Sequence, residues 1–358
     1  MQPMTQSLLV ECARLAAGGG AGAIATVARR RGSLPMSATA KLLVAASGAR
    51  FGTVGGGCLE AEIIERAQSV IETREPAVSE HSLNAELAGD YGLTCGGTAL
   101  MFIEPVYVDD LLAAVYAESV SLLARGERAE LVTALDWSRG PRKALLSGAR
   151  VTGSSDSVLQ IAAQRFDTRR EDPLWLDGVL VERLAGAPRL IVFGGGHVGA
   201  RVADAASFAG WRVTIVDDRE EFADGSRLPF AERTVVCDFH ALPSTLGIDA
   251  ETYVVDATRG HQHDAMIIEQ IAVRDTRYLG MLGSRRKVAL TWSLLERAGV
   301  PSERLALVHA PVGLAIGADT PAEIAISVVG EMIAVRRQGT RRRGGAPEAI
   351  SVGGAEEP

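Results

Sequence analysis

The sequence predicts an α/β protein in which a C-terminal Rossmann-type parallel sheet follows a smaller mixed α+β N-terminal domain. From residue 189 onward, short apolar runs alternate with longer segments of helical periodicity, as in parallel sheets wrapped by helices. The first of these runs leads into the glycine-rich segment 194–199 and then into a helical pattern. Before residue 189, short strand patterns are separated by turn-like segments, which favours antiparallel pairing.

The length of the chain indicates two domains. It has 358 residues, of which 47% are hydrophobic, and so exceeds what a single core usually organises. We expect an N-terminal domain over residues 1–187, a Rossmann-like domain over residues 188–336 and a disordered tail over residues 337–358, which is basic and then glycine-rich. Ala187-Pro188 marks the expected linker.

Charge and cysteine content argue against several classes of protein. The net charge of -7 and the pI near 5.5 give no overall positive charge that would bind nucleic acid. The four cysteines form no C-x-x-C pair, so neither a disulfide framework nor a structural zinc site is indicated. The apolar stretch 18–28 is too short for a membrane span and lacks the basic segment of a signal peptide. We expect a soluble, cytoplasmic protein with no nucleic-acid or membrane partner.

In the N-terminal domain, the spacing of apolar residues predicts several helices and short strands. The predicted helices cover residues 6–17, 59–71 and 109–125. The predicted strands cover residues 23–28, 41–46, 51–54, 99–103 and 129–135. The pattern weakens between residues 72 and 90, and one or two further strands are expected between residues 137 and 187. The short turns between the first three strands indicate a small antiparallel sheet.

In the C-terminal domain, six apolar runs predict parallel strands with helices after most of them. These runs are residues 190–193, 212–216, 234–237, 252–255, 277–281 and 305–308. A helix over residues 321–335 closes the fold, with Thr320 as its N-cap and Pro321 at its first helical position.

The turn between the first of these strands and its helix predicts a phosphate site. Its residues are Gly194, Gly195, Gly196, His197 and Gly199. Glycines let the backbone approach a phosphate at the positive end of a helix. Asp217 lies about twenty residues further on, where a carboxylate accepts hydrogen bonds from ribose hydroxyls, and Asp218 is the neighbouring alternative. A tight turn without a ligand is the other interpretation, and the strand-to-helix context favours the ligand.

Two further segments lie where loops follow strands of the predicted parallel sheet. Ser284, Arg285, Arg286 and Lys287 place cations at the start of a helix, where they oppose its dipole unless an anion binds between them. Three solvated surface cations are the alternative. Arg259 and His261 follow the fourth strand, at the sheet edge where ligands of open α/β sheets bind. Five of the six histidines lie in this half of the chain; an acid–base or substrate-binding role is favoured over a metal site, because no spacing matches a zinc pattern.

Two candidate sites lie in the N-terminal domain. Gly55, Gly56 and Gly57 join a strand to a helix and form a second possible anion cradle. Cys95 follows Thr94 and precedes two glycines, so its thiolate is a candidate nucleophile or ligand for a soft metal. A buried, inert cysteine is the alternative for this position.

Together these motifs resemble the XdhC/CoxI family of xanthine dehydrogenase accessory proteins. The N-terminal part of the resemblance consists of residues 31–35, 52–60, 94–97 and 103–105. The C-terminal part consists of residues 194–199, 257–261, 283–287, 309–314 and 317–321. The combination of Gly-Ser-Arg-Arg-Lys at 283–287 with His-Ala-Pro-Val-Gly at 309–313 is more specific than any single motif.

The resemblance implies a non-catalytic chaperone of molybdenum cofactor, in its molybdopterin or nucleotide form. Such a protein binds the cofactor while a cysteine desulfurase partner installs the sulfido ligand, and delivers it to a molybdenum hydroxylase client. By the same resemblance Cys95 takes part in cofactor binding, near the metal. We expect a homodimer. The residues themselves leave two alternatives open, an NAD(P)-dependent oxidoreductase using Asp217 and either His261 or His309, and a dinucleotide sensor without catalysis.

Overall fold

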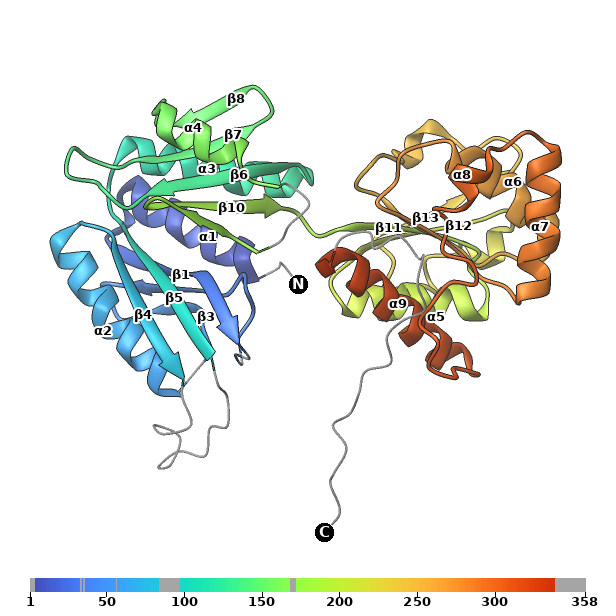
Figure 1. Ribbon diagram of the computed structural model, residues 1–358, viewed down its shortest axis with the longest axis horizontal. Coiled ribbons are helices and arrows are strands. Elements are labelled where there is room, and N and C mark those ends of the chain that lie inside the picture. Colours follow the sequence, from blue (N-terminus) through green and yellow to red (C-terminus); the bar gives the residue numbers. More distant parts are fainter. Residues whose placement is uncertain are drawn as a thin grey trace, which may run out of the picture. The chain divides into compact units, whose positions relative to one another are not determined.

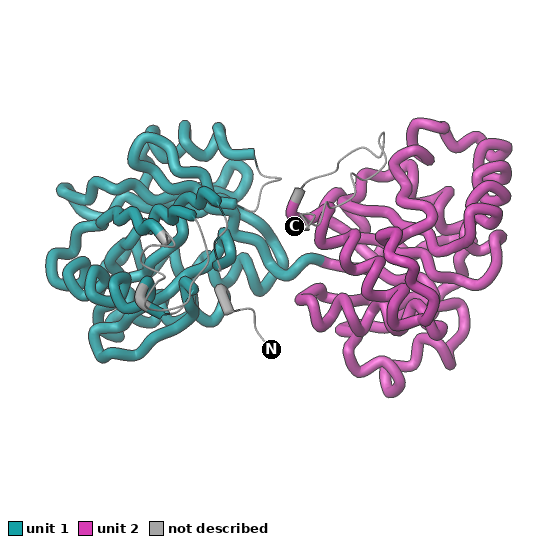
Figure 2. Tube along the Cα trace, turned by 60° about the horizontal axis from the view of Figure 1, so that its bottom comes forward, with its two compact units in different colours: residues 1–188 teal, residues 189–358 magenta. Residues whose placement is uncertain are grey.

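A computed structural model describes residues 4–32, 34, 36–55, 57–83, 97–167 and 172–338. The chain divides into two compact units, residues 1–188 and residues 189–358 (Figure 2). No helix in the described part of the chain is both long and apolar enough to cross a lipid bilayer.

The first unit begins with a five-stranded antiparallel sheet of order β3-β2-β1-β5-β4. Its strands are β1 (Gly22–Gly32), β2 (Lys41–Ala45), β3 (Arg50–Thr53), β4 (Ala77–Leu83) and β5 (Gly97–Val106). Helix α2 (Gly57–Thr73) packs its apolar residues Leu59, Ile63, Ala67 and Val70 on one face of this sheet. The predicted antiparallel sheet and its helix are therefore confirmed; β4 was missed because its sequence mixes serine, glutamate and histidine with few apolar residues.

A second antiparallel sheet has the order β8-β7-β6-β10-β9. Its strands are β6 (Arg128–Ala134), β7 (Lys143–Ser147), β8 (Arg150–Gly153), β9 (Leu174–Leu176) and β10 (Val179–Ala185). Four of these strands, together with helix α4 (Ser157–Gln164), lie where one or two strands were predicted. That prediction was wrong because strands of three to seven residues are too short for a clear alternation of apolar and polar residues.

Helices α1 (Met4–Arg14), continued by a π-helical turn (Leu15–Gly19), and α3 (Asp110–Arg125) pack against each other in the first unit. Their apolar side chains share one core with residues from both sheets. Two buried ion pairs also join the sheets. Lys143 Nζ lies 2.7 Å and 2.9 Å from the two carboxylate oxygens of Glu104, and Lys41 pairs with Glu182. The two sheets are thus joined by both apolar packing and charge.

The second unit is built on a parallel sheet, as predicted, and the order of its strands is β13-β12-β11-β14-β15. Its strands are β11 (Arg189–Phe193), β12 (Arg212–Asp217), β13 (Arg233–Val236), β14 (Tyr253–Asp256) and β15 (Tyr278–Met281). Helices α5 (His197–Phe208) and α9 (Pro321–Gln338) cover one face, and α6 (His261–Ala272) and α7 (Arg285–Arg297) cover the other (Figure 1). The order changes direction at β11, so the loops after β11 and β14 diverge and leave a crevice at their carboxyl ends.

The sixth predicted strand, residues 305–308, is not formed. Helix α8 (Ser302–Leu305) and a turn occupy this segment, because Pro301 begins a helix that buries Leu305 and leaves Leu307 exposed. Pairing with β15 is limited to an isolated parallel bridge between His309 and Gly280. The predicted cap of the last helix is confirmed, since Thr320 Oγ1 accepts from Glu323 N–H at 3.3 Å and Glu323 accepts in return from Thr320 N–H at 3.0 Å.

Candidate functional site

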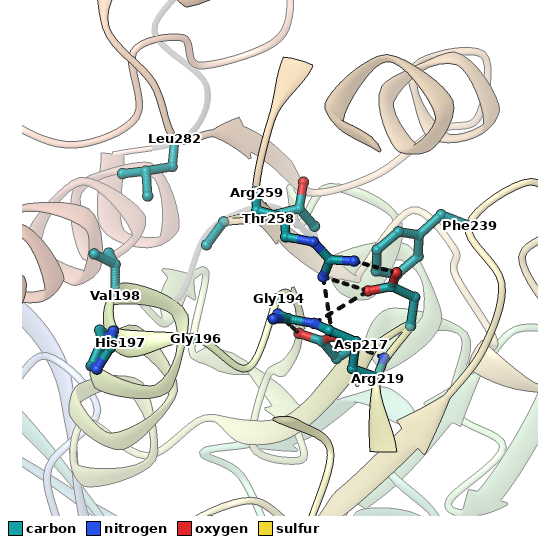
Figure 3. A pocket seen from close by; sticks show the side chains of 12 residues that line it. Gly194, Gly196, His197, Val198, Asp217, Arg219, Phe239, Thr258, Arg259 and Leu282 are labelled. Atoms are coloured by element: carbon teal, nitrogen blue, oxygen red, sulfur yellow. Dashed lines mark hydrogen bonds and ion pairs between the residues drawn. The ribbon is translucent and has the colours of Figure 1, made fainter. Parts of the chain in front are cut away.

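A cavity of about 280 Å³ opens at the carboxyl ends of β11, β12 and β14 (Figure 3). Gly194, Gly196 and His197 line it from the turn after β11, Asp218 from the turn after β12, and Arg259 from the loop after β14. The structure thus brings the predicted glycine turn, the two aspartates and Arg259 together around one crevice. Its volume is near the lower limit of ordinary ligand pockets, which suits one part of a large ligand.

Packing explains three of the four glycines at this turn. A Cβ on Gly195 would lie 1.8 Å from the carbonyl oxygen of Phe222, and one on Gly199 would lie 1.9 Å from the carbonyl oxygen of Gly194. Gly194 has a positive φ of 97°, and its Cβ would approach the carbonyl oxygen of Ala257 at 2.6 Å. These glycines are needed to form the turn, whatever binds there.

Gly196 differs from its neighbours because neither its backbone conformation nor its packing requires a glycine. Its φ of −70° and ψ of −173° are accessible to any residue, and in the described part of the chain an added Cβ would meet no atom within 4 Å apart from its chain neighbours. Gly196 is the N-cap of α5 and lines the cavity. The first amides of a helix have no acceptor within the helix and carry the positive end of its dipole. The missing side chain therefore leaves room for an anionic ligand at a helix N-terminus.

Asp217 is held by the protein itself. Its carboxylate, 1% exposed, accepts from Gly195 N–H at 2.9 Å, from Arg219 N–H at 3.0 Å, and from the Arg219 guanidinium at 3.0 Å and 3.2 Å. The Arg219 guanidinium also stacks 3.5 Å above the ring centre of Phe222. The predicted ribose acceptor thus fixes the glycine turn against β12, and its proposed contact with a ribose is untested.

Asp218 faces the crevice and forms a bidentate ion pair with Arg259. The two carboxylate oxygens accept from Arg259 Nη1 at 2.9 Å and Nη2 at 2.8 Å. Burial acts to raise the pKa of Asp218, but hydrogen bonds with Arg259, with Asp217 and with the backbone, together with the charge of Arg259, lower the pKa below the usual value. The Asp218 side chain is 25% exposed and that of Arg259 is 49% exposed, so both remain accessible from solvent.

A buried polar cluster holds the loop that carries Arg259. Thr258 N–H donates to Asp256 at 3.1 Å, and Thr258 Oγ1 donates to Asp264 at 2.9 Å. Lys287 Nζ lies 2.7 Å from the second oxygen of Asp264 and donates to the carbonyl oxygen of Leu282. Burial, and then the charge of Asp264, raise the pKa of Asp256 to about 8. The cluster therefore fixes the loop that carries Arg259.

This cluster explains why a lysine stands in the first turn of α7. The sequence suggested that an anion binds among Ser284, Arg285, Arg286 and Lys287, and the buried carboxylate of Asp264 provides one from within the protein. The Ser284 hydroxyl caps α7 by accepting from Lys287 N–H at 3.2 Å. Arg285 and Arg286 are exposed, and none of the four residues lines the cavity. A ligand at the two arginines remains a prediction.

The five histidines of the second unit lie at different places in it. His261 is the exposed first residue of α6 and does not line the cavity, whereas His197 does. His309 pairs with Glu331 at 3.1 Å. Burial acts to raise the pKa of Glu331, but hydrogen bonds from His309, Gly313 N–H and Tyr278 lower it to about 2. Within the described residues, no three His, Cys, Asp or Glu side chains come together in a way that could hold a metal ion.

The predicted N-terminal sites are described only in part. Gly55 and Gly57 have positive φ values of 123° and 66°, which favour glycine at the start of α2 for backbone reasons alone. Gly55 N–H donates to Thr53 Oγ1, which in turn donates to Glu60. Gly56 and Cys95 lie outside the described residues. The anion cradle at 55–57 and the cofactor contact at Cys95 therefore remain predictions.

Comparison with known proteins identifies the family. The XdhC Rossmann domain matches residues 190–332, and the XdhC and CoxI family matches residues 15–82. The chain is 26% identical, over 88% of its length, to a probable xanthine dehydrogenase subunit of Bacillus subtilis, of which it covers 93%. It is also 26% identical to the uncharacterized protein YqeB of Escherichia coli K12, but spans only 43% of that protein.

A solved structure shows the same fold over nearly the whole chain. It is the crystal structure of a xanthine dehydrogenase from Bacillus halodurans, with 26% identity and a TM-score of 0.72. The match covers 96% of this chain and 98% of that one. The chain belongs to the XdhC and CoxI family of xanthine dehydrogenase accessory proteins.

Proposed function

We propose that this protein binds molybdenum cofactor as cargo, supports its sulfuration and delivers it to a xanthine dehydrogenase-type molybdenum hydroxylase. The observation that carries the proposal is Gly196, a glycine that the fold does not require and that leaves a helix N-terminus open to a ligand in the crevice. The name of the Bacillus subtilis relative, a probable xanthine dehydrogenase subunit, supports the choice of client.

One end of molybdenum cofactor, its phosphate, suits this crevice. Molybdenum cofactor is a pterin that carries a phosphate, often extended by a nucleotide, and a molybdenum dithiolene centre. The phosphate suits the amides at the start of α5, next to Gly196 and His197. A cavity of about 280 Å³ is too small for the whole cofactor, so the pterin and the metal extend beyond it. We propose Cys95 as the thiolate that contacts the metal end, since thiolates suit soft metals.

The charges around the crevice favour holding a ligand over transforming it. The carboxylate of Asp217 is paired with Arg219, and that of Asp218 is paired with Arg259. The pKa of Asp218 is lowered in part by Arg259, so this carboxylate is a weak proton acceptor. In this proposal the sulfur comes from a cysteine desulfurase partner, and the protein acts as a cytoplasmic homodimer that keeps the cofactor bound until transfer.

The proposal is tested by pterin retention. The purified protein is incubated anaerobically with released molybdenum cofactor and passed through a desalting column, and the retained pterin is oxidised and quantified by fluorescence. We expect near-stoichiometric retention by the wild type, and a loss of about tenfold or more in affinity for Gly196→Ala, because its methyl group occupies the phosphate position. Cys95→Ala should also retain less pterin than the wild type.

The matched control is Gly225→Ala, an exposed glycine of the same unit whose Cβ would lie 3.8 Å from its nearest neighbour. This variant should retain pterin like the wild type. Equal retention by Gly196→Ala and the wild type would remove the crevice from the proposal. If the wild type retains no pterin but oxidises NADH, an NAD(P)-dependent oxidoreductase would replace the carrier.

A further inference from the structure

One end of the first sheet forms an exposed ledge. In β1 the first seven residues are buried and the last four are exposed. These four residues pair with the start of β5, with Arg29 opposite Leu100 and Arg31 opposite Thr98. Cys95 lies outside the described residues, two positions before the start of β5. The ledge therefore includes the end of β5 that leads to this cysteine.

A β-bulge in β1 determines which of its arginines share a face of the sheet. The register with β5 shifts by one residue between Val27 and Arg29. Opposite residues of an antiparallel pair lie on the same face, so Arg29 and Arg31 lie on the face of Leu100. A regular strand would place Arg30 there instead. With the bulge, Arg30 lies on the face of α2 and donates to a backbone carbonyl at 2.7 Å. Bulges of this kind often re-aim side chains beside functional sites.

The charges of these two arginines are not paired with a carboxylate. Both residues are exposed, and in the described part of the chain neither side chain forms an ion pair or a hydrogen bond. Residues two apart in a strand are separated by about 7 Å, so the two charges repel each other. Glu80 lies on the same face, but two strands away from Arg29, at a spacing of about 10 Å. An anion bound between the arginines would remove their repulsion.

An aromatic side chain lies on the same face of the sheet. Trp175 of β9 packs against Phe102 of β5, with ring centres 5.6 Å apart, and β9 lies against β1. Trp175 shares its apolar cluster with Ala28 and Leu100, which are next to Arg29 and opposite it. The tryptophan is partly exposed. An aromatic ring beside two unpaired cations suits a flat ring that carries negative charge.

We propose that this ledge, together with Trp175, binds the pterin end of the cargo. The inference rests on the proposed function. The crevice of the second unit has room for the phosphate end, so the pterin needs a site of its own. The pterin ring stacks on Trp175, as bases stack on aromatic side chains. The dithiolene is attached to the pterin ring system and carries negative charge, so Arg29 and Arg31 bind that side of the same ligand.

Two soluble pterins test the inference. Pterin-6-carboxylate has a negative charge next to the ring, whereas 6-hydroxymethylpterin has the same ring without the charge. Equilibrium dialysis with fluorescence detection measures the affinity of each. The wild type should bind pterin-6-carboxylate about tenfold more tightly, since hydrogen bonds to charged groups are the strong ones. The double substitution Arg29→Gln and Arg31→Gln should abolish this preference. Trp175→Leu should weaken both pterins about tenfold, because it removes the stacking contact.

Matched variants separate binding from packing. Arg66→Gln removes an exposed arginine of α2, which covers the opposite face of the same sheet, and should leave both affinities unchanged. Trp175→Phe keeps an aromatic ring against Phe102, so it should bind both pterins more tightly than Trp175→Leu does. Arg29 and Arg31 are exposed, so their substitution should leave the fold intact.

Several results would overturn the inference. It fails if the wild type binds neither pterin or binds both equally, or if the double arginine variant keeps the preference. It also fails if Trp175→Leu binds both pterins as tightly as the wild type. Failure of the carrier proposal is measured separately, by retention of released cofactor. Retention that is unchanged in the ledge variants would leave the carrier standing without this inference. Selective binding of pterin-6-carboxylate without retention would support the ledge and contradict the carrier.

Discussion

Alanine substitutions at Gly195 and Gly196 should have different effects on stability, although the two residues are adjacent. A Cβ on Gly195 would lie 1.8 Å from the backbone oxygen of Phe222 and 2.8 Å from its carbonyl carbon, against an ordinary contact distance of about 3.5 Å. Because the obstacle is backbone, the turn must shift, and Gly195→Ala should lose about 3 kcal/mol of unfolding free energy. Its shift also breaks the hydrogen bond from Gly195 N–H to Asp217.

Gly196→Ala should leave the fold intact. The extended backbone at this position accepts alanine, and in the described part of the chain no atom beyond the chain neighbours lies within 4 Å of the added methyl group. Replacing glycine removes freedom from the unfolded chain, but alanine is less favourable than glycine at an N-cap, so we expect a change of less than about 1 kcal/mol in unfolding free energy. The ligand, in contrast, loses its space, so affinity for released pterin cofactor should fall.

Urea unfolding measures the change in unfolding free energy of each variant, and titration measures the loss of ligand affinity in Gly196→Ala. The buried indole of Trp211 reports the second unit by its fluorescence. Unfolding of Gly195→Ala at the same urea concentration as the wild type would contradict the predicted clash with Phe222. Destabilisation of Gly196→Ala as strong as that of Gly195→Ala would also contradict it, since the two glycines would then have the same structural role.

Three further predictions concern buried charges. Lys143→Met leaves the Glu104 carboxylate, 1% exposed, without its counter-charge, and should cost about 3 to 5 kcal/mol in urea unfolding; a loss below about 1 kcal/mol would contradict the structure. Asp256 holds a proton in the folded state because its pKa is raised from 3.8 to about 8, so wild-type stability should fall as pH rises from about 4 to 8. Asp256→Asn should make stability depend less on pH over this range. The same pH dependence in the variant and the wild type would contradict a raised pKa of Asp256. The pKa of Glu331 is lowered from 4.5 to about 2, so it stabilises the fold above pH 4.5 and this contribution is lost as pH falls to 2. The stability of Glu331→Gln should therefore depend less on pH between 2 and 4.5. Identical acid-unfolding curves for the variant and the wild type would show that Glu331 does not contribute to the pH dependence of stability.

Local patterns predicted most of the fold. The run 190–193 followed by glycines, and the Thr320-Pro321 start of α9, are signals that depend on adjacent residues, and both were confirmed. The predicted strand at 305–308 was wrong because the same apolar residues also fit a single helical turn after Pro301. Short strands such as β9, with three residues, carry no periodicity to detect.

The candidate site was less predictable, because its contacts join residues far apart in the sequence. No local pattern shows that Lys287 pairs with Asp264, or that Arg259 reaches Asp218. The motif position of Asp217 suggested a ribose acceptor, but Arg219, only two residues later, folds back on it. Asp256 and Asp264 were missed, although an aspartate at the end of a buried strand and another in the next helix are a usable signal for such a cluster.

Delivery to a client enzyme is the most direct test of whether the protein carries molybdenum cofactor. Wild-type protein loaded with sulfurated cofactor is mixed with cofactor-free xanthine dehydrogenase, and the recovered hydroxylase activity is compared with that from the same amount of free cofactor. We expect the loaded protein to restore more activity than free cofactor, and Gly196→Ala, prepared in the same way, to restore no more than free cofactor does. If the wild type gives no advantage over free cofactor, the carrier role is contradicted. If Gly196→Ala restores as much activity as the wild type, the crevice is not where the cofactor is held.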